Sequence, residues 1–477
     1  MKHPKIVIVG AGSLFFGRKL IWAMNKLEGL CEGHLALVDT DPEHLEGMRK
    51  LAEKVRVLSG ARHEISASTN FREALPEADF IILSFSHRNA YYRGVDVQVS
   101  ARHGIRMCSG DTIGPGGIFR AMREFPKVME IAAAVEETCP EAWLINYINP
   151  SSVFGIALSR YCKVRNFALC DSLHLPYLHH NYMKMIGLDP KESAEFTMRI
   201  AGVNHFTWLL EAQFRGRNVM PEIHEALRTL GEEEKAAASA KALYNRRISA
   251  ALADVFGAIP VCTAHTKEYL PYFQGYGGHP EAEVVPPLSL FEDDKREGIT
   301  EQMWREIGEY TSGQRPIGEF LKKGASDHAT DVIEAIWNDS GQHFFVNVPN
   351  QGAVPNLPLE AILELECEVG REGPRPIRVP EMPIGLRGLQ MQIHDTHELT
   401  VEAFMQRDRN LLLRALCTDP LVPSLATARA VLADLYTAEK EALEPWIGKD
   451  ADPGNQGRQK SASVVDSVHQ GQTPEGH

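Results

Sequence analysis

The chain has 477 residues, too many for one ordinary hydrophobic core, so we expect a large domain with a second lobe or a substantial insertion. Hydrophobic residues account for 44% of the sequence and charged residues for 24%, which is typical of soluble globular proteins. The 50 lysines and arginines stand against 63 aspartates and glutamates, giving a net charge of −13. This acidic balance argues against nucleic acid or an anionic membrane as a partner, and no apolar run has the length of a membrane span.

The N-terminus and the cysteines favour a cytoplasmic protein. The apolar run that starts at residue 5 is broken by Gly10 and Gly12 and leads to no small-residue cleavage site, so we interpret it as a strand and not as a signal peptide. The eight cysteines form no C-x-x-C pair, which indicates free thiols in a reducing compartment. They are Cys31, Cys108, Cys139, Cys162, Cys170, Cys262, Cys367 and Cys417.

Short apolar runs alternate with helical patterns over the first 170 residues. This alternation predicts a parallel sheet with helices on both faces, an α/β fold of the doubly wound Rossmann type. The predicted strands are 5–10, 34–40, 65–69, 78–85, 142–150 and 165–172, and the predicted helices are 13–27, 41–60, 119–138 and 151–162.

The pattern changes after about residue 195. Residues 195–219 mix β-branched and aromatic side chains without a helical face and predict antiparallel strands, which makes the second region α+β. Helical patterns return at 220–255, 300–322 and 398–446. We therefore expect a first domain over 1–195, a second region over 196–448, and a polar, disordered tail over 449–477.

The first strand runs into Gly10-Ala11-Gly12-Ser13-Leu14-Phe15, a G-x-G-x-x-F sequence that lacks the third glycine of the dinucleotide fingerprint. The two glycines still permit a tight turn and a close approach of the backbone to a pyrophosphate at a helix N-terminus. Asp39 ends the second strand, where a carboxylate binds the ribose hydroxyls and repels a 2′-phosphate, so NAD is favoured over NADP. The alternative is a glycine turn that binds no nucleotide.

Asn149 and Cys170 end two successive predicted strands. Ligands of such sheets bind outside the carboxyl ends of the strands, so both side chains should face the nicotinamide crevice. His205 follows in AGVNHFTWL, and a thiolate with an imidazole suits a borderline divalent metal while leaving positions for substrate oxygens. By spacing alone, one Cys and one His are more often core residues than a shared site.

Seven motifs occur together in one order along the chain. They are GDTIGPGGIFRAMREFP (110–126), WLINYINPSS (143–152), LCDS (169–172), AGVNHFTWL (201–209), HTKEYLPYF (265–273), VNVPNQGAVPNLP (346–358) and VEAFMQRDRNLLLRALCTDPLV (401–422). In this combination the chain resembles glycoside hydrolase family 4, the NAD- and divalent-metal-dependent α-galactosidases, α-glucosidases and α-glucuronidases. The resemblance runs from residue 5 to about 446.

The resemblance implies a lactate/malate-dehydrogenase-like Rossmann domain over 1–195 and a region for substrate, metal and oligomerisation over 196–448. It also implies an exception to the two-carboxylate rule of glycosidases. In this family the sugar is oxidised at C3 by hydride transfer to NAD, and the resulting ketone makes the C2 proton acidic. A base removes that proton, the metal stabilises the enolate, the C1–O bond breaks by elimination, and water addition and re-reduction complete the cycle.

Cys170 and His205 fall on the family's metal ligands, usually for manganese, which makes Cys170 a ligand thiolate. Asp171 is our choice for the acid at the leaving group; the alternative is an N-cap for a helix that begins near Leu173. Many members that act on unphosphorylated sugars carry His after the cysteine, and 6-phospho-α-glucosidases carry Asp. Asp171 followed by Ser172 fits neither subgroup cleanly.

The family's base is a tyrosine in several members, and HTKEYLPYF offers Tyr269, our first choice, and Tyr272. Either residue is alternatively an aromatic lining of the pocket. His265, four positions before Tyr269, is a candidate for substrate contact or a surface histidine.

Three further residues are expected to bind substrate: Asn149, Arg93 and Asn204. Arg93 and Asp96 resemble an R-x-x-D segment of the family's site, with a surface ion pair on one helical turn as the alternative. Asp111, Gly116 and Gly117 are expected to shape the cofactor pocket, and His394, Asp395 and His397 to cap the last helix and face solvent.

The function predicted from these residues is hydrolysis of an α-galactoside, α-glucoside or α-uronide with catalytic NAD and Mn²⁺ or another divalent metal. The alternatives are an NAD-dependent sugar or hydroxy-acid dehydrogenase, a 6-phospho-α-glycosidase and a non-catalytic NAD-binding sensor. A homodimer or homotetramer is expected by analogy with the family.

Overall fold

The structure is a computed structural model that describes residues 3–15, 17–24, 30, 32–229, 239–274, 288–323 and 328–443. The tail predicted over 449–477 lies outside these described residues. No helix in the described part of the chain is both long enough and apolar enough to cross a membrane.

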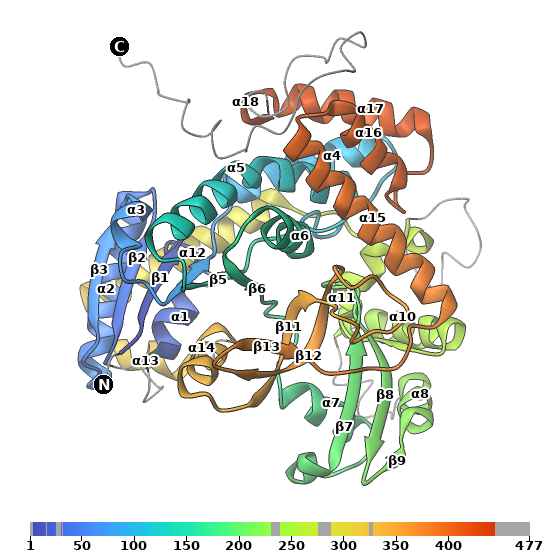
Figure 1. The fold of residues 1–477 in the computed structure, drawn as a ribbon, viewed down its shortest axis with the longest axis horizontal. Helices are drawn as coiled ribbons and strands as arrows, with labels where there is room; N and C mark the ends of the chain where they lie inside the picture. Colours follow the sequence, from blue (N-terminus) through green and yellow to red (C-terminus); the bar gives the residue numbers. More distant parts are fainter. Residues whose placement is uncertain are drawn as a thin grey trace.

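A nine-stranded sheet runs through the molecule in the order β13-β12-β11-β6-β5-β4-β1-β2-β3 (Figure 1). The six strands from the first predicted domain are all parallel, which confirms the predicted Rossmann-type sheet. They are β1 (Lys5–Val9), β2 (His34–Val38), β3 (Glu64–Ser68), β4 (Phe80–Leu83), β5 (Trp143–Asn146) and β6 (Arg165–Ala168). Parallel pairing brings the carboxyl ends of these strands to one edge, where Val9, Val38 and Leu83 share a register.

Three strands from the second half of the chain extend this sheet. β11 (Gln342–Pro349) pairs antiparallel with β6, and β12 (Ile362–Gly370) and β13 (Gly373–Pro376) follow it. The sheet therefore combines residues on both sides of position 195, the boundary expected between the two regions.

Helices cover the sheet as their apolar spacing predicts. α2 (Pro42–Ser59) begins where the Asp41 carboxylate accepts hydrogen bonds from the backbone of Glu43 and His44, and it ends at Gly60 with φ 72°. The other helices around the parallel strands are α1 (Gly17–Met24), α3 (Phe71–Ala74), α4 (Asn89–Arg102), α5 (Gly114–Thr138) and α6 (Ser151–Tyr161). α5 begins five residues earlier than the predicted helix at 119, so its first turn lies in the G-P-G-G motif.

A second, smaller sheet confirms the antiparallel strands predicted after residue 195. It consists of β7 (Phe196–Ala201), β8 (Trp208–Phe214), β9 (Arg217–Asn218) and β10 (Ile259–Pro260). Its apolar side chains form a core of their own that also takes in Phe345 of β11, so the two sheets are packed together. The short elements around it are α7 (Tyr177–Met185), a 3-10 helix (Pro190–Glu195), α8 (Met220–Arg228), α10 (Ala240–Phe256) and α11 (Thr263–Thr266).

The remaining α-helices lie in the second half of the chain, and in Figure 1 α15 runs from beside α16 toward α10. They are α12 (Asp293–Ser312), α13 (Ile317–Lys323), α14 (His328–Asn338), α15 (Ile384–Gln406), α16 (Arg409–Thr418), α17 (Leu425–Ala438) and α18 (Lys440–Leu443). α15 starts ten residues before His394, so the expected cap is wrong: His394 and His397 are buried inside the helix, and only Asp395 faces solvent.

Candidate active site

Cys170 and His205 meet at the carboxyl edge of the parallel sheet, as predicted. Cys170 lies two residues beyond the end of β6, and His205 lies in the loop between β7 and β8 with φ 66°. The distance from His205 Nε2 to Cys170 Sγ is 3.2 Å, and both side chains are buried. The fold thus joins two residues 35 positions apart, which spacing alone did not indicate.

This pair fits a shared metal ion. At zinc's bond lengths of about 2.3 Å to sulfur and about 2.0 Å to nitrogen, two ligands at the tetrahedral angle lie about 3.5 Å apart, so the observed 3.2 Å is close to the separation that a shared ion requires. In the described part of the chain no group of three His, Cys, Asp or Glu residues is arranged to hold a metal. An ion held by two protein ligands would have further coordination positions for substrate oxygens. Burial raises the pKa of the Cys170 thiol to about 12, and a bound cation is what would favour the thiolate here.

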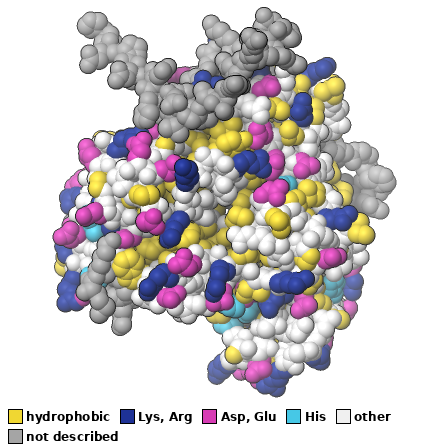
Figure 2. All heavy atoms as spheres, viewed as in Figure 1, with side chains coloured by type: hydrophobic (Ala, Val, Ile, Leu, Met, Phe, Trp, Pro, Cys, Tyr) yellow, Lys and Arg dark blue, Asp and Glu magenta, His cyan; other side chains and the backbone are white. Residues whose placement is uncertain are grey.

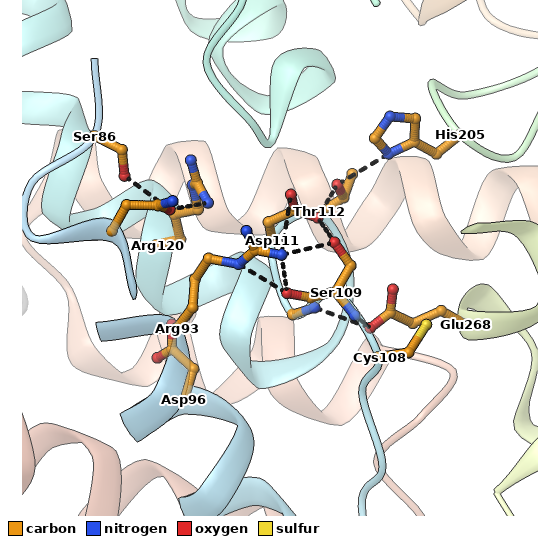
Figure 3. A network of polar contacts seen from close by, with 12 residues as sticks. Ser86, Arg93, Asp96, Cys108, Ser109, Asp111, Thr112, Arg120, His205 and Glu268 are labelled. Atoms are coloured by element: carbon orange, nitrogen blue, oxygen red, sulfur yellow. Dashed lines mark hydrogen bonds and ion pairs between the residues drawn. The ribbon is translucent and has the colours of Figure 1, made fainter. Parts of the chain in front are cut away.

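A relay behind His205 fixes its orientation (Figure 3). Thr112 Oγ1 lies 3.3 Å from His205 Nδ1 and donates to the Asp111 carboxylate at 3.2 Å. In this arrangement Nδ1 carries the proton and donates to Thr112, which leaves Nε2 as the free lone pair for a cation. Through this hydroxyl the Asp111 carboxylate supports His205, much as a carboxylate bonded directly to a metal-binding histidine does.

Asp111 is the centre of a wider charged network and does more than shape a pocket. Arg93 lies 3.7 Å from its carboxylate and donates from Nε to the backbone oxygen of Ser109 at 2.9 Å. Burial would raise the pKa of Asp111, but Arg93 and Arg120 lower it far below its ordinary value. Glu268 braces the same loop by accepting the backbone N–H groups of Ser109 and Gly110, each at 2.9 Å.

Arg93 and Asp96 do not form the surface ion pair that one helical turn would allow. Both side chains are buried on α4 and point to different partners. Arg93 joins Asp111, whereas Asp96 pairs with Arg123 at 2.8 Å, and Arg123 also pairs with Glu439 at 2.5 Å. Only Arg93 therefore belongs to the site, and Asp96 anchors the helix that carries it.

Asp171 is not the helix cap that its sequence position also suggested. α7 begins only at Tyr177, with Pro176 at its N-cap, and the carboxylate of Asp171 instead pairs with Lys19 of α1. His174 Nε2 lies 3.1 Å from the other carboxylate oxygen. Burial by itself would raise the pKa of Asp171, but the bonds from His174 and Lys19 bring it below its usual value.

The two candidate tyrosines lie in different environments. Tyr269 is fully buried, its hydroxyl donates to the backbone oxygen of Asn204 at 2.8 Å, and burial raises its pKa well above 10. Tyr272 has 58% of its surface exposed. His265 is not on the surface: its ring stacks on that of His205 with centroids 4.1 Å apart, and burial lowers its pKa to about 3. Tyr269 and His265 thus both lie at the metal-ligand loop.

Two supports of this loop were not foreseen. Gln390 of α15 accepts the backbone N–H of Val203 and donates to the backbone oxygen of Phe206, both at 2.8 Å. Glu364 of β12 accepts hydrogen bonds from the side chains of Asn204, at 3.3 Å, and Thr207. The glutamates that alternate with apolar residues in ILELECEV were the one signal for Glu364, whereas nothing local marked Gln390.

The nucleotide end is built mainly from backbone. Gly10 has φ 90°, and a Cβ atom there would come within 2.7 Å of the backbone nitrogen of Phe85, which explains the glycine. The backbone N–H of Gly12 donates to the Asp39 carboxylate at 2.8 Å, so the acid at the end of β2 holds the turn itself. Ser13 and Leu14 complete this turn before α1, and Asn149 lies half-buried after β5.

Comparison with known proteins agrees with this architecture. A family model described as "Family 4 glycosyl hydrolase" matches residues 5–178, and one described as "Family 4 glycosyl hydrolase C-terminal domain" matches 200–422. An α-galactosidase of Bacillus subtilis is 28% identical over 93% of this chain and 99% of its own length. An α-galacturonidase of the same organism is 29% identical over 88% of this chain and 93% of its own.

Solved structures share the fold. The crystal structure of the putative glucosidase lplD of Bacillus subtilis has a TM-score of 0.79 at 26% identity and covers 91% of this chain and 100% of its own. A 6-phospho-α-glucosidase from gut microorganisms, solved with NAD and Mn²⁺, has a TM-score of 0.78 at 22% identity over 94% of this chain and 99% of its own. The two family models, the relatives of full length and the shared fold agree, and the chain belongs to glycosyl hydrolase family 4.

Proposed function

We propose that this protein hydrolyses small glycosides with NAD and a divalent metal, Mn²⁺ in the first instance, as catalytic cofactors. The observation that carries the proposal is the contact between Cys170 and His205 at the carboxyl edge of a sheet whose first turn is Gly10–Leu14. A metal-ligand pair beside a nucleotide turn is what a redox-assisted elimination needs. A hydroxy-acid or sugar dehydrogenase needs the nucleotide-binding turn but does not need the metal ligands Cys170 and His205.

The cofactor-binding residues would be Gly10, Gly12, Ser13 and Leu14 at the pyrophosphate, and Asp39 at the adenosine ribose. Cys170 and His205 would hold the metal. When bound, NAD supplies a hydride acceptor for C3 and the metal a Lewis acid for the sugar oxygens at C2 and C3.

Asp171 is the proposed proton donor to the leaving group. It lies next to the metal ligand in sequence, and its carboxylate is held by Lys19 and His174. Because these partners favour the ionised form, proton donation requires that the contact with Lys19 be broken or that the pH be low. The acid role therefore requires that the ion pair between Lys19 and Asp171 can open.

Tyr269 is the proposed base at C2, with Tyr272 as the less supported choice because it is exposed. The role requires the hydroxyl of Tyr269 to leave the backbone oxygen of Asn204, to which it donates here. Arg93, Asn149 and Asn204 are the proposed substrate contacts.

The substrate we propose is an α-galactoside, α-glucoside or α-uronide, with a 6-phospho-α-glycoside as the second choice. Relatives with different printed activities are nearly equidistant: the α-galactosidase at 28%, the α-galacturonidase at 29% and a maltose-6′-phosphate glucosidase of Bacillus subtilis at 29%. Identity alone thus selects no sugar, and the choice belongs to experiment.

Three further proposals follow from the sequence. The 1–195 portion binds the nucleotide, and the 196–448 portion supplies substrate contacts and an interface for a homodimer or homotetramer. The location is the cytoplasm, in keeping with the free cysteines among the described residues. On the face shown in Figure 2, acidic and basic side chains are interspersed, which suits a small-molecule substrate better than a nucleic acid.

The test is a panel of nitrophenyl α- and β-glycosides, including uronides and 6-phospho forms, assayed with NAD, Mn²⁺ and a reducing agent. Aglycone release that stops on removal of either NAD or metal, with no net NADH, is the expected result and also names the sugar. NADH accumulation without aglycone release would establish a dehydrogenase instead. NAD binding without either product would favour the sensor.

A further inference from the structure

Glu364 is a buried carboxylate directly behind the metal-ligand loop. It lies on β12, is 2% exposed, and its backbone N–H donates to the backbone oxygen of Gly202 at 2.7 Å. This bond ties the strand to the start of the loop that carries His205. Among the described residues, no hydrogen bond or ion pair joins Glu364 to the nucleotide turn, to Asp171 or to Tyr269.

The two carboxylate oxygens of Glu364 serve two different donors. Oε1 accepts from Asn204 Nδ2 at 3.3 Å, and Oε2 accepts from Thr207 Oγ1. Asn204 comes one residue before His205, and Thr207 comes two residues after it. The carboxylate of Glu364 therefore bonds the loop on both sides of the proposed metal ligand His205. An amide in the same place would offer one acceptor instead of two.

In the described part of the chain, Glu364 lacks the lysine or arginine partner that a buried carboxylate usually has. Among the residues that the structure describes, no Lys or Arg forms an ion pair with it, whereas Glu366, two residues on along the same face of β12, pairs with Arg199 at 3.2 Å and His343 at 2.8 Å. A buried carboxylate without a cation is costly unless something nearby compensates for it. Burial raises the pKa of Glu364, and a divalent ion held by Cys170 and His205 would favour its ionised form.

We infer that Glu364 is a positioning residue of the metal site, which holds Asn204 and Thr207 so that His205 faces Cys170 and which balances the charge of the bound ion. The inference rests on the proposed metal-dependent function. It adds a residue from β12, a strand of the large sheet, to a site whose two proposed metal ligands come from the end of β6 and the β7–β8 loop.

The experiment compares Glu364→Gln with Glu366→Gln in the full-length protein. Glu366 is the matched control, because it is a buried carboxylate on the same strand and face whose ion-pair partners in the described residues, Arg199 and His343, lie outside the His205 loop. Mn²⁺ affinity is titrated through the electron paramagnetic resonance signal of the free ion, and the thermal midpoint is measured without metal. Co²⁺ reports the bond to Cys170 through its thiolate charge-transfer absorption.

We expect Glu364→Gln to weaken Mn²⁺ binding about 10–100-fold, the usual effect of losing a partner of a metal ligand, while its metal-free thermal midpoint stays near that of Glu366→Gln. Glu366→Gln should bind Mn²⁺ as the wild type does. Thr207→Val removes one donor and should weaken binding in the same direction, with little further effect when Glu364 is already Gln, because the two groups form one network. If Glu364→Gln does not fold, Thr207→Val carries the test.

Wild-type Mn²⁺ affinity in a folded Glu364→Gln protein, or an equal loss in Glu366→Gln, would overturn the inference and leave the proposed function intact. A wild-type protein that binds no Mn²⁺ would overturn both. The readouts need no substrate, so they do not depend on finding the sugar.

Discussion

The two ends of the proposed site are built in opposite ways. The nucleotide end is local: consecutive residues from Gly10 to Leu14 form one turn, and the acid that supports it ends the neighbouring strand. The metal end is assembled from side chains of β12, α15 and three separate loops around His205. A backbone turn is specified by a short motif, whereas a side-chain cluster exists only after the sheets have packed together.

The largest difference between the two ends should come from Cys170→Ser. Loss of the thiolate should reduce Mn²⁺ affinity by more than the roughly 10–100-fold typical of residues that only support a ligand, and glycoside hydrolysis should fall with it. NAD affinity should stay at the wild-type level. Equilibrium titrations with Mn²⁺ and NAD measure both, and a parallel loss of NAD binding would show that the two ends are not separable.

Thr112→Val tests the relay behind His205. The valine keeps the shape but removes the hydroxyl that links His205 Nδ1 to Asp111, so Mn²⁺ affinity should fall about 10–100-fold. Thr400→Val is the control, because it removes a buried hydroxyl that donates to the backbone oxygen of Thr396 on its own helix at 2.8 Å. Equal Mn²⁺ affinities for the two variants would show that Thr112 does not support His205 as a metal ligand.

Gly10→Ala should damage the other end. The alanine must adopt φ 90° and bring its Cβ within 2.7 Å of the Phe85 backbone, a strain of at least about 1–2 kcal/mol. NAD binding should weaken while Mn²⁺ binding persists. Gly60→Ala at a helix end, which also has a positive φ but nothing within 4 Å, controls for backbone strain alone. Isothermal calorimetry with NAD distinguishes the two variants, because Gly60→Ala should lower the stability of the protein without lowering its affinity for NAD.

The smallest effect is expected from Lys19→Met. Lys19 lies on α1, the helix after the nucleotide turn, and pairs with Asp171, the residue next to Cys170. The pKa of Asp171 is lowered partly by Lys19, so removing the amine should raise it. If Asp171 acts as the acid, the alkaline limb of kcat/KM should move to higher pH. The ion pair contributes to stability above the unfolded pKa of Asp171 and is lost as pH falls through the folded value; being partly exposed, it should contribute less than about 1 kcal/mol. An unchanged pH profile would contradict the acid role.

The sequence predicted the parallel sheet, the nucleotide turn and the pair Cys170 and His205, the last only through resemblance to a family. It missed Glu364 and Lys19, whose partners lie 157 and 152 positions away, because no local pattern records such contacts. The start of α15 was misjudged for a related reason: HDTHE has the composition of a helix cap, but burial against the core decides where that helix runs. Contacts that depend on tertiary packing were the ones that could not be predicted.

The joining of β11 to β6 has a consequence for how the chain is made. β6 ends at residue 168, but its neighbour β11 starts only at residue 342. During synthesis the edge of β6 therefore stays unpaired until β11 has left the ribosome. An uncovered strand edge invites pairing with other chains. A fragment ending at residue 195 would carry this bare edge permanently, and we expect it to aggregate where the full-length chain does not.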